Sequence, residues 1–234
     1  MTTRQSLVLI PGLLCDPLLW APQVEGLADT ADIWVAGAGG HDSIAGIAAD
    51  VLRHCPFERF SLAGLSMGGY VALEMWRQAA RRVERLALLD TTARPDAPEA
   101  AAARRALMET ARAQGLTPVA QALLPRLVWP RAPRSEALAA TVRTMAWNVG
   151  VDAFLRQEAA IIGRADSRDT LPRIDCPALV ACGNDDILTP PAVHEEMAAG
   201  IPGATLVRFE DCGHLSTLER PDDVNHALRA WLDR

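Results

Sequence analysis

Gly64-Leu65-Ser66-Met67-Gly68-Gly69 joins a short apolar run, Phe60–Ala63, to a segment of helical spacing that begins at Met67. A Gly-x-Ser-x-Gly sequence at a strand-to-helix junction is typical of a turn so tight that the serine backbone is strained and its hydroxyl projects from the sheet. Glycines two residues away on either side remove the Cβ atoms that would collide there. Ser66 is therefore the candidate nucleophile, and the following helix directs its N-terminal amides and positive dipole end at it.

Short apolar runs recur along the chain and alternate with segments of helical spacing. The runs predict buried strands at Ser6–Ile10, Ile33–Val35, Phe60–Ala63, Leu86–Leu89, Ala178–Ala181 and Thr205–Phe209. Helices are expected at Ile44–Arg53, Met67–Ala80, Pro191–Ala199 and Asp222–Leu232. Several runs lack polar alternation, which is typical of a parallel sheet covered on both faces. The pattern predicts an α/β fold with an open, doubly wound parallel sheet of about six strands.

A stretch of about 80 residues interrupts this alternation. From Thr92 to Arg173 there is no convincing strand, and helical spacing recurs at Glu99–Gln114, Pro118–Leu127, Ser135–Trp147 and Asp152–Ile162. So long an insertion exceeds an ordinary connection between strands. We expect a core sheet made of residues 1–91 and 174–234, with residues 92–173 forming a helical cap over one end of it. The alternative is that these helices pack as an additional layer.

The charged residues exclude several classes of chemistry. All 23 cationic side chains are arginines, and the chain has no lysine. This excludes Schiff-base catalysis, a pyridoxal enzyme and a P-loop lysine. The formal net charge is −6 and the arginines are scattered, so nucleic acid is not an expected partner.

Other features of the sequence argue against a membrane span, disulfide bonds and a metal site. No apolar run approaches the roughly 20 residues that span a bilayer, and Leu7–Ile10 is too short for a signal peptide. We therefore expect a cytoplasmic protein with no membrane partner. The five cysteines form no CxxC pair and are expected to be reduced. The five histidines show no metal-ligand spacing, so neither a metal nor an organic cofactor is expected.

Two further motifs follow predicted strands. Gly183-Asn184-Asp185-Asp186-Ile187-Leu188-Thr189-Pro190-Pro191 comes after one strand, and Asp211-Cys212-Gly213-His214-Leu215 comes after the last. With the turn at Ser66, the strand order and the place of the insertion, they make the whole chain resemble the α/β-hydrolase superfamily. The resemblance is to a small version that begins at the third of the usual eight strands. It implies that nucleophile, acid and base follow in this order along the chain.

The resemblance also assigns the general base that a serine hydroxyl needs and the acid behind it. His214 lies where such enzymes carry the base, and the other histidines lack this placement. The family's G-x-x-D-x-x-x-P spacing selects Asp186, whose role would be to fix the imidazole tautomer and stabilise the imidazolium. Asp185, one residue away, is the rival. Asp90 ends the run Leu86–Leu89, where some relatives carry the acid instead.

The stretch Ile10-Pro11-Gly12-Leu13-Leu14 follows the first predicted strand. By resemblance, the backbone N–H groups of Leu13 and Met67 form the oxyanion hole. Relatives often have His-Gly where this chain has Pro-Gly, but backbone donors survive such a change. Removing one donor of this kind typically costs ~10²–10³ in rate. Cys15 lies nearby and is expected to be a small apolar wall residue.

Three stretches resemble 3-oxoadipate enol-lactonases and related small carboxylesterases: Gly-Leu-Ser-Met-Gly-Gly, Thr-Pro-Pro after the acid, and Gly-His-Leu-Ser-Thr-Leu-Glu around the base. The resemblance implies a serine hydrolase that cleaves a small ester or lactone through an acyl-enzyme. Since C–C bond hydrolases share these stretches, they remain an alternative. Hydroxynitrile lyases of this fold often use a cap lysine, which this chain lacks. A non-catalytic binder is disfavoured by the intact set of Ser66, Asp186 and His214.

The substrate pocket is expected under the cap. Large apolar residues that could line it are Leu14, Trp129, Met145, Trp147, Phe154 and Leu215. Most of the cap residues in this group could equally join the cap to the core. A diacid substrate would need a pocket arginine, and the sequence does not select among the candidates in the cap, which are Arg94, Arg104, Arg105, Arg112, Arg126, Arg131, Arg134, Arg143, Arg156 and Arg164.

Overall fold

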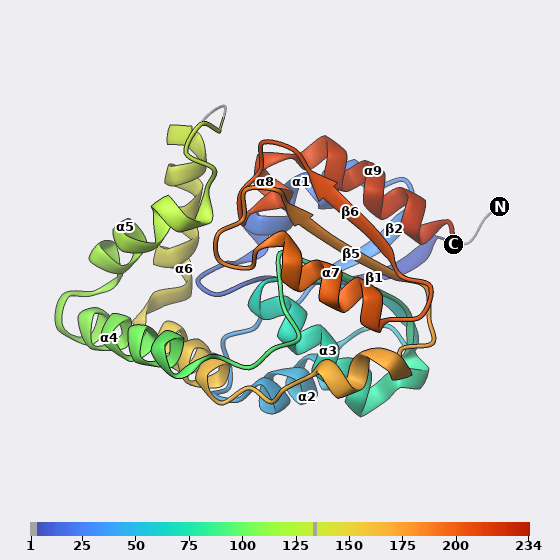
Figure 1. The fold of residues 1–234 in the computed structure, drawn as a ribbon, viewed down its shortest axis with the longest axis horizontal. Coiled ribbons are helices and arrows are strands. Elements are labelled where there is room, and N and C mark those ends of the chain that lie inside the picture. The colour runs from blue at the N-terminus through green and yellow to red at the C-terminus, as the bar shows by residue number, and fades with distance from the viewer. Residues whose placement is uncertain (1–3, 133–134) are drawn as a thin grey trace.

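A six-stranded sheet in the order β2-β1-β3-β4-β5-β6 forms the centre of the protein, and every neighbouring pair of strands is parallel (Figure 1). The computed structural model describes residues 4–132 and 135–234, so Arg134 lies outside the described residues. The strands are β1 Gln5–Ile10, β2 Ala31–Val35, β3 Phe60–Leu65, β4 Val83–Leu89, β5 Ala178–Gly183 and β6 Thr205–Phe209. The predicted fold class is confirmed.

Alternate side chains of the strands enter two separate hydrophobic layers. On one face, Val8, Leu62 and Leu88 pack with residues of α2 (Ile44–His54), α3 (Met67–Ala79) and α7 (Pro191–Gly200). On the other face, Leu7 and Leu89 pack with α9 (Pro221–Leu232) and with Trp20 and Leu27, which flank α1 (Ala21–Gly26). Because both faces are covered, the fully buried parts of the central strands are almost entirely apolar, as the sequence pattern indicated.

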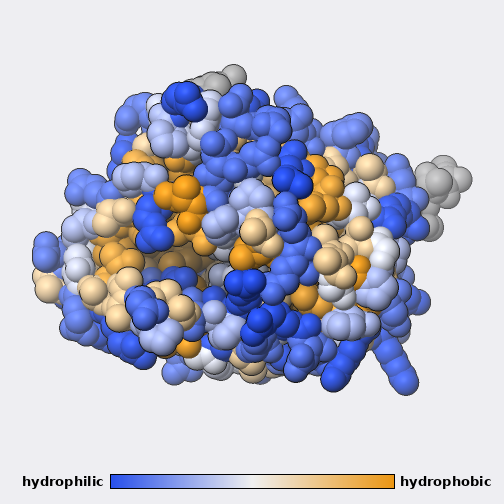
Figure 2. All heavy atoms as spheres, in the orientation of Figure 1, coloured by the Kyte–Doolittle hydropathy of each residue, from blue (hydrophilic) through white to orange (hydrophobic). Residues whose placement is uncertain are grey.

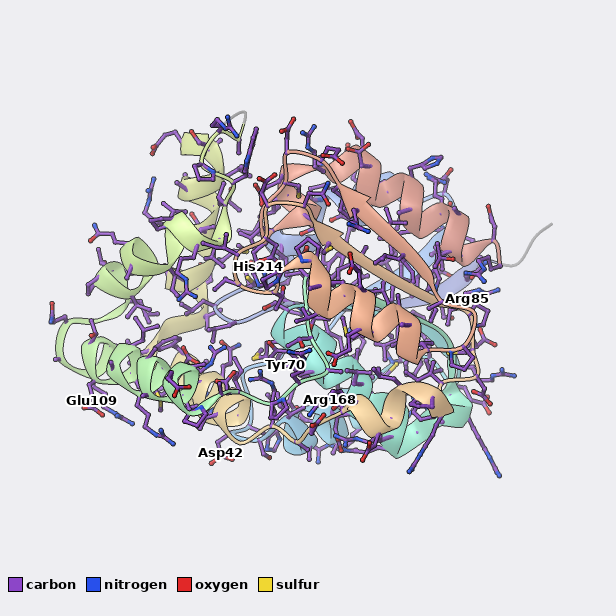
Figure 3. The ribbon with its side chains drawn as sticks, in the orientation of Figure 1. Asp42, Tyr70, Arg85, Glu109, Arg168 and His214 are labelled. Atoms are coloured by element: carbon purple, nitrogen blue, oxygen red, sulfur yellow. The ribbon has the colours of Figure 1, made fainter. Side chains whose placement is uncertain are left out.

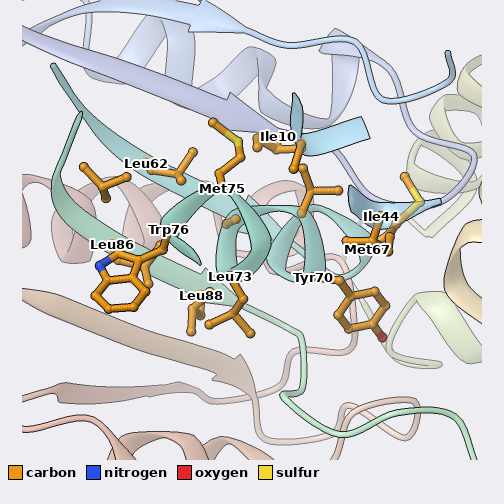
Figure 4. Packing of buried hydrophobic residues seen from close by; sticks show 14 of the residues in the cluster. Ile10, Ile44, Leu62, Met67, Tyr70, Leu73, Met75, Trp76, Leu86 and Leu88 are labelled. Atoms are coloured by element: carbon orange, nitrogen blue, oxygen red, sulfur yellow. The ribbon is translucent and has the colours of Figure 1, made fainter. Parts of the chain in front are cut away.

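Helix α3 lies against the middle of the sheet. Its residues Met67, Leu73 and Met75 are almost fully buried against strand residues that include Ile10 and Leu62 (Figure 4). A helix packed over its whole inner face is a rigid support for the residue that precedes it. That residue is Ser66.

In its described residues, the insertion between β4 and β5 contains three α-helices and ends with the 3-10 helix Arg168–Arg173. We call residues 92–173 the inserted segment. Its α-helices are α4 Pro98–Gln114, α5 Leu116–Leu127 and α6 Ser135–Ile162. They stand beside the end of the sheet to which β5 and β6 point (Figure 1). The predicted break between Trp147 and Asp152 lies at Gly150, which interrupts α6 with a positive φ of 77°.

The sequence pattern does not predict several short helices, among them α1 and α8 (Ser216–Glu219), each too short for a hydrophobic repeat to show. Among the described residues, no helix combines the length and the apolar character that crossing a membrane requires.

Candidate active site

Ser66 sits between β3 and α3 in a backbone conformation that non-glycine residues rarely adopt, with φ 56° and ψ −117°. Its N–H donates to the carbonyl of Leu89 on β4 at 2.9 Å. A Cβ at Gly64 would collide with the Gly68 carbonyl, and one at Gly68 would collide with the Ile10 carbonyl. The glycines predicted from the motif are therefore required by close backbone approach.

His214 lies between the Ser66 hydroxyl and Asp186. Its Nε2 is 2.8 Å from Ser66 Oγ, and its Nδ1 is 2.8 Å from Asp186 Oδ2. The ring comes from the loop between β6 and α8, on the side of the sheet that faces the inserted segment (Figure 3). With Nδ1–H donating to Asp186, Nε2 is free to accept the Ser66 proton.

Asp186 is held in place by its own loop. Its Oδ1 accepts the N–H groups of Leu188 at 2.8 Å and Thr189 at 3.0 Å, and its Oδ2 accepts the Thr189 hydroxyl at 2.6 Å. Asp185 is exposed, and its side chain makes no hydrogen bond or ion pair within residues 4–132 and 135–234. Of the two neighbouring carboxylates, it is Asp186 that contacts His214.

The two buried aspartates near His214 have opposite pKa shifts. Burial raises the pKa of Asp186, but the charge and hydrogen bond of His214 and the bonds from Thr189 outweigh it, and the pKa falls below 3.8. Burial, and then the charge of Asp186, raise the pKa of Asp90 to about 8. Asp186 is therefore the carboxylate that is ionised beside the ring at neutral pH.

The pKa of His214 is also shifted. Burial lowers it, but the Asp186 carboxylate, through its charge and its hydrogen bond, outweighs burial and raises the pKa above the ordinary 6.5. The imidazolium is thus stabilised by a neighbouring negative charge, which is the effect a general base needs while it holds a proton.

The backbone around His214 is fixed by Glu219 and by the inserted segment. Glu219 accepts the N–H groups of Gly213, Leu215 and Trp129, at 3.2, 3.1 and 2.8 Å. The N–H of His214 donates to the Leu127 carbonyl at 3.0 Å. Glu219 ends the stretch Gly-His-Leu-Ser-Thr-Leu-Glu. The sequence does not predict its role, because that role depends on a turn that brings its side chain back to the backbone around His214.

The predicted oxyanion donors belong to two segments next to Ser66. Leu13 lines the same cavity as Ser66, and Met67 is the first residue of α3. The next residue, Leu14, has a positive φ of 56°, and its N–H donates to Gln157 Oε1 at 3.1 Å. Gln157 is almost fully buried and also donates to the Ala38 carbonyl at 3.3 Å. Gln157 reaches this turn from α6, and no local pattern in the sequence marks it.

A cavity of about 270 Å³ opens above Ser66 and His214, bounded by the core on one side and by α4, α5 and α6 on the other. Figure 2 shows a hollow with hydrophobic walls on this side of the molecule. Of the predicted pocket residues, Leu14, Met145 and Leu215 line the cavity. Cys15 also lines it, and burial raises the pKa of its thiol to about 12, so the thiol stays protonated.

Three predicted pocket residues lie outside this lining. Trp147 is 84% exposed, on the outer side of α6 just before the break at Gly150. Phe154 is fully buried among apolar residues of the inserted segment and Leu14. Trp129 is partly buried against the second hydrophobic layer, with the Arg131 guanidinium 5.2 Å above its ring. The hydrophobicity of a residue does not show whether its side chain lines the cavity, packs between helices or faces solvent.

No group of three or more His, Cys, Asp or Glu side chains that could hold a metal ion occurs in the described part of the chain. The functional groups that converge on the cavity are the hydroxyl of Ser66, the ring of His214 and several arginines. Such a set suits nucleophilic attack with general-base assistance.

Known proteins share this arrangement of the chain. The structure is similar to that of a thermophilic esterase from Thermogutta terrifontis with malate bound, with a TM-score of 0.88 and 31% identity over 99% of this chain and 90% of the other. It is also similar to the enol-lactonase from Burkholderia xenovorans LB400, with a TM-score of 0.89 and 30% identity over 99% and 92%. In sequence, 3-oxoadipate enol-lactonase 2 from Acinetobacter baylyi is 26% identical over 99% and 90%.

The match to a family covers nearly the whole chain. The alpha/beta hydrolase family matches residues 7–227, which include every strand except the first two residues of β1. The fold, the topology of the sheet and this match agree. The protein belongs to the alpha/beta hydrolase family.

Proposed function

We propose that this protein is a serine hydrolase that cleaves a carboxylic ester or lactone of a small molecule through an acyl-enzyme. One observation carries the proposal. Ser66 Oγ, the His214 ring and the Asp186 carboxylate form a continuous line of two contacts of 2.8 Å, and its serine end opens into the cavity. This is the spacing that a nucleophile, a general base and an orienting acid require.

In the proposed reaction, Ser66 Oγ attacks the carbonyl carbon while its proton passes to His214 Nε2. The amides of Leu13 and Met67 bind the negative charge that develops on the carbonyl oxygen. His214 then gives its proton to the leaving alkoxide. A water molecule, deprotonated by His214, hydrolyses the acyl-enzyme and frees Ser66. In this proposal the inserted segment acts as a cap that shields the reacting atoms from bulk water.

The arginines of the cavity indicate what else the substrate carries. Arg104 and Arg164 both pair with Asp96, at 2.7 and 2.6 Å, and Arg104 also pairs with Glu158 at 2.9 Å. Arg126 lines the cavity from α5 and makes no ion pair within the described residues. A guanidinium without a carboxylate partner at the edge of an apolar cavity suits a substrate with a carboxylate of its own.

The comparisons agree with an acidic substrate. The Thermogutta esterase structure holds malate, and the Acinetobacter relative is named for 3-oxoadipate. Both names are those of dicarboxylates. We therefore propose that the ester or lactone bears a carboxylate, and that Arg126 contacts it.

A panel of substrates tests the proposed reaction. We expect hydrolysis of p-nitrophenyl butyrate and of small lactones, and no cleavage of vinylogous 1,5-diketones, which C–C hydrolases accept. Within the same panel, p-nitrophenyl hydrogen glutarate and p-nitrophenyl valerate match in chain length and differ in charge. Arg126→Ala should reduce kcat/KM for the glutarate about tenfold, equivalent to about 1.4 kcal/mol, and leave the valerate value within about twofold.

Arg105→Ala is the matched control, because Arg105 is an exposed arginine on α4 that does not line the cavity. Equal losses for both esters in Arg126→Ala would refute the assignment of a carboxylate contact. Cleavage of the diketone with no ester or lactone turnover would replace the proposed reaction by C–C hydrolysis. No turnover of any member would favour the non-catalytic binder.

The pH dependence of kcat/KM follows from the His214 pKa. Only neutral His214 can accept the Ser66 proton, and its pKa is raised above 6.5. Activity toward p-nitrophenyl butyrate should therefore fall as the pH drops through a midpoint above about 6.5. The midpoint can be measured from hydrolysis rates between pH 5 and 9, recorded at the isosbestic wavelength of p-nitrophenol. His226→Gln removes an exposed histidine and should leave the midpoint in place, whereas a flat profile would exclude His214 as the base.

A further inference from the structure

Two fully buried polar residues, Asp90 and Thr91, follow β4 directly. Strand β4 lies between β3, which leads to Ser66, and β5, which leads to the loop of Asp186. Asp90 has a positive φ of 45°, a conformation that an aspartate adopts only where its surroundings impose it. Neither residue lines the cavity.

Asp90 joins the loops that carry the acid and the base. Its Oδ1 accepts the N–H of Gly183, where the acid loop leaves β5, at 3.1 Å. Its Oδ2 accepts the N–H of Ser216 at 3.2 Å and also the Ser216 hydroxyl. Ser216 lies two residues after His214. Both carboxyl oxygens are thus engaged by donors from these two loops, and neither contacts the His214 ring.

Thr91 joins the nucleophile to the helix beyond the acid loop. Its hydroxyl donates to the Ser66 carbonyl at 2.7 Å, and its N–H donates to His194 Nε2 at 2.9 Å. His194 is fully buried, and its Nδ1 lies 3.3 Å from the Pro190 carbonyl, just after the acid loop. A Cβ at Gly69 would collide with the Thr91 side chain, so α3 is pressed against this threonine.

We propose that Asp90 and Thr91 form a positioning pair that keeps the three catalytic loops in register. Their bonds reach the Ser66 backbone, the start of the Asp186 loop and the residue beyond the His214 turn, and together these fix the two contacts of 2.8 Å on which proton transfer depends. The inference rests on the proposed triad. Because a displacement of about 1 Å in such a site can cost 10²-fold in rate, the pair acts on kcat without touching the substrate.

Thr91→Val tests the Ser66 connection, since valine keeps the shape of threonine and removes the hydroxyl. We expect kcat for p-nitrophenyl butyrate to fall by about tenfold to hundredfold with KM within about twofold. The rate at which a fluorophosphonate labels Ser66 should fall in parallel. Thr91→Ser keeps the hydroxyl and should recover most of both rates. The matched control is Ser61→Ala on β3, which removes a buried hydroxyl that has no hydrogen-bond partner in the described residues.

Asp90→Asn tests the link between the acid and base loops. A carboxyl group, protonated or not, keeps an oxygen toward the N–H of Gly183 and another toward the N–H of Ser216, whereas the amide must turn its NH₂ group toward one of these donors. We expect a loss of kcat of about tenfold or more, and a smaller loss for Ser216→Ala, which removes only the hydroxyl donor. If Asp90→Asn does not fold, Ser216→Ala and Thr91→Val provide the test of the positioning pair. A lower Tm with wild-type kcat and labelling rates in both would overturn the proposal, as would Thr91→Ser failing to recover activity. Activity retained in Ser66→Ala would instead overturn the triad itself.

Discussion

Replacing Ser66 by alanine is expected to lower kcat toward p-nitrophenyl butyrate by about 10⁶-fold, the scale of loss seen when a catalytic serine is removed. The hydroxyl contacts His214 Nε2 at 2.8 Å and faces the cavity, and no other nucleophile there is activated. The thiol of Cys15 is near, but burial raises its pKa to about 12, so it carries no thiolate at neutral pH. Without Ser66 Oγ no acyl-enzyme can form.

Stability measurements separate this chemical loss from misfolding. Alanine keeps the Cβ and the positive φ of 56° at this position, so the strain in the turn is unchanged. The Tm of Ser66→Ala should therefore stay close to that of the wild type. Ser61→Ala again serves as the control for loss of a serine hydroxyl elsewhere. Hydrolysis by Ser66→Ala at more than about one per cent of the wild-type rate would assign the nucleophile to another group.

The tight turn at Ser66 and the strands of the sheet could be predicted because the residue patterns that mark them are local. A tight turn needs glycine at Gly64 and Gly68, and these requirements are visible within a few residues of Ser66. Likewise, strands covered on both faces must be largely apolar, so β5 and, apart from Ser61, β3 stand out as apolar runs. Where the backbone geometry imposes the residue type, the sequence alone is sufficient.

The walls of the site depend on contacts between distant segments, so they were not predictable. Gln157 reaches the Leu14 amide from 143 positions away. Trp147 and Met145 are two residues apart on α6, yet one is 84% exposed and the other is buried at the cavity, because they lie on different sides of the helix. Which side faces the core is decided by packing of α4, α5 and α6 on one another, and periodicity does not specify that packing.

The identity of the acid was only partly predictable from the sequence. Spacing favoured Asp186 over Asp185, but two adjacent aspartates in a loop differ only in which way each side chain points. The structure distinguishes them by burial, since Asp186 is 2% exposed and Asp185 is exposed to solvent. The hydrogen bonds from Leu188 and Thr189 then fix the Asp186 carboxylate in one orientation.

That orientation predicts the effect of Asp186→Asn. Oδ1 accepts two backbone N–H groups, so the amide oxygen of the asparagine must occupy its place. The NH₂ group then replaces Oδ2 and donates to His214 Nδ1. The ring is driven into the tautomer with its proton on Nε2, which can no longer accept the proton of Ser66. The expected loss is about 10⁴-fold in kcat, the value typical when a triad aspartate becomes asparagine.

Asp185→Asn is the matched control, because it makes the same chemical change one residue away on a side chain that neither contacts His214 nor is buried. Its kcat should remain within about twofold of the wild type. Comparing the two variants on p-nitrophenyl butyrate, with Tm measured for both, separates the loss of the tautomer from any disturbance of the loop. If Asp185→Asn were the inactive variant, the acid would be Asp185. If both retained activity, the ring would need no acid from this loop.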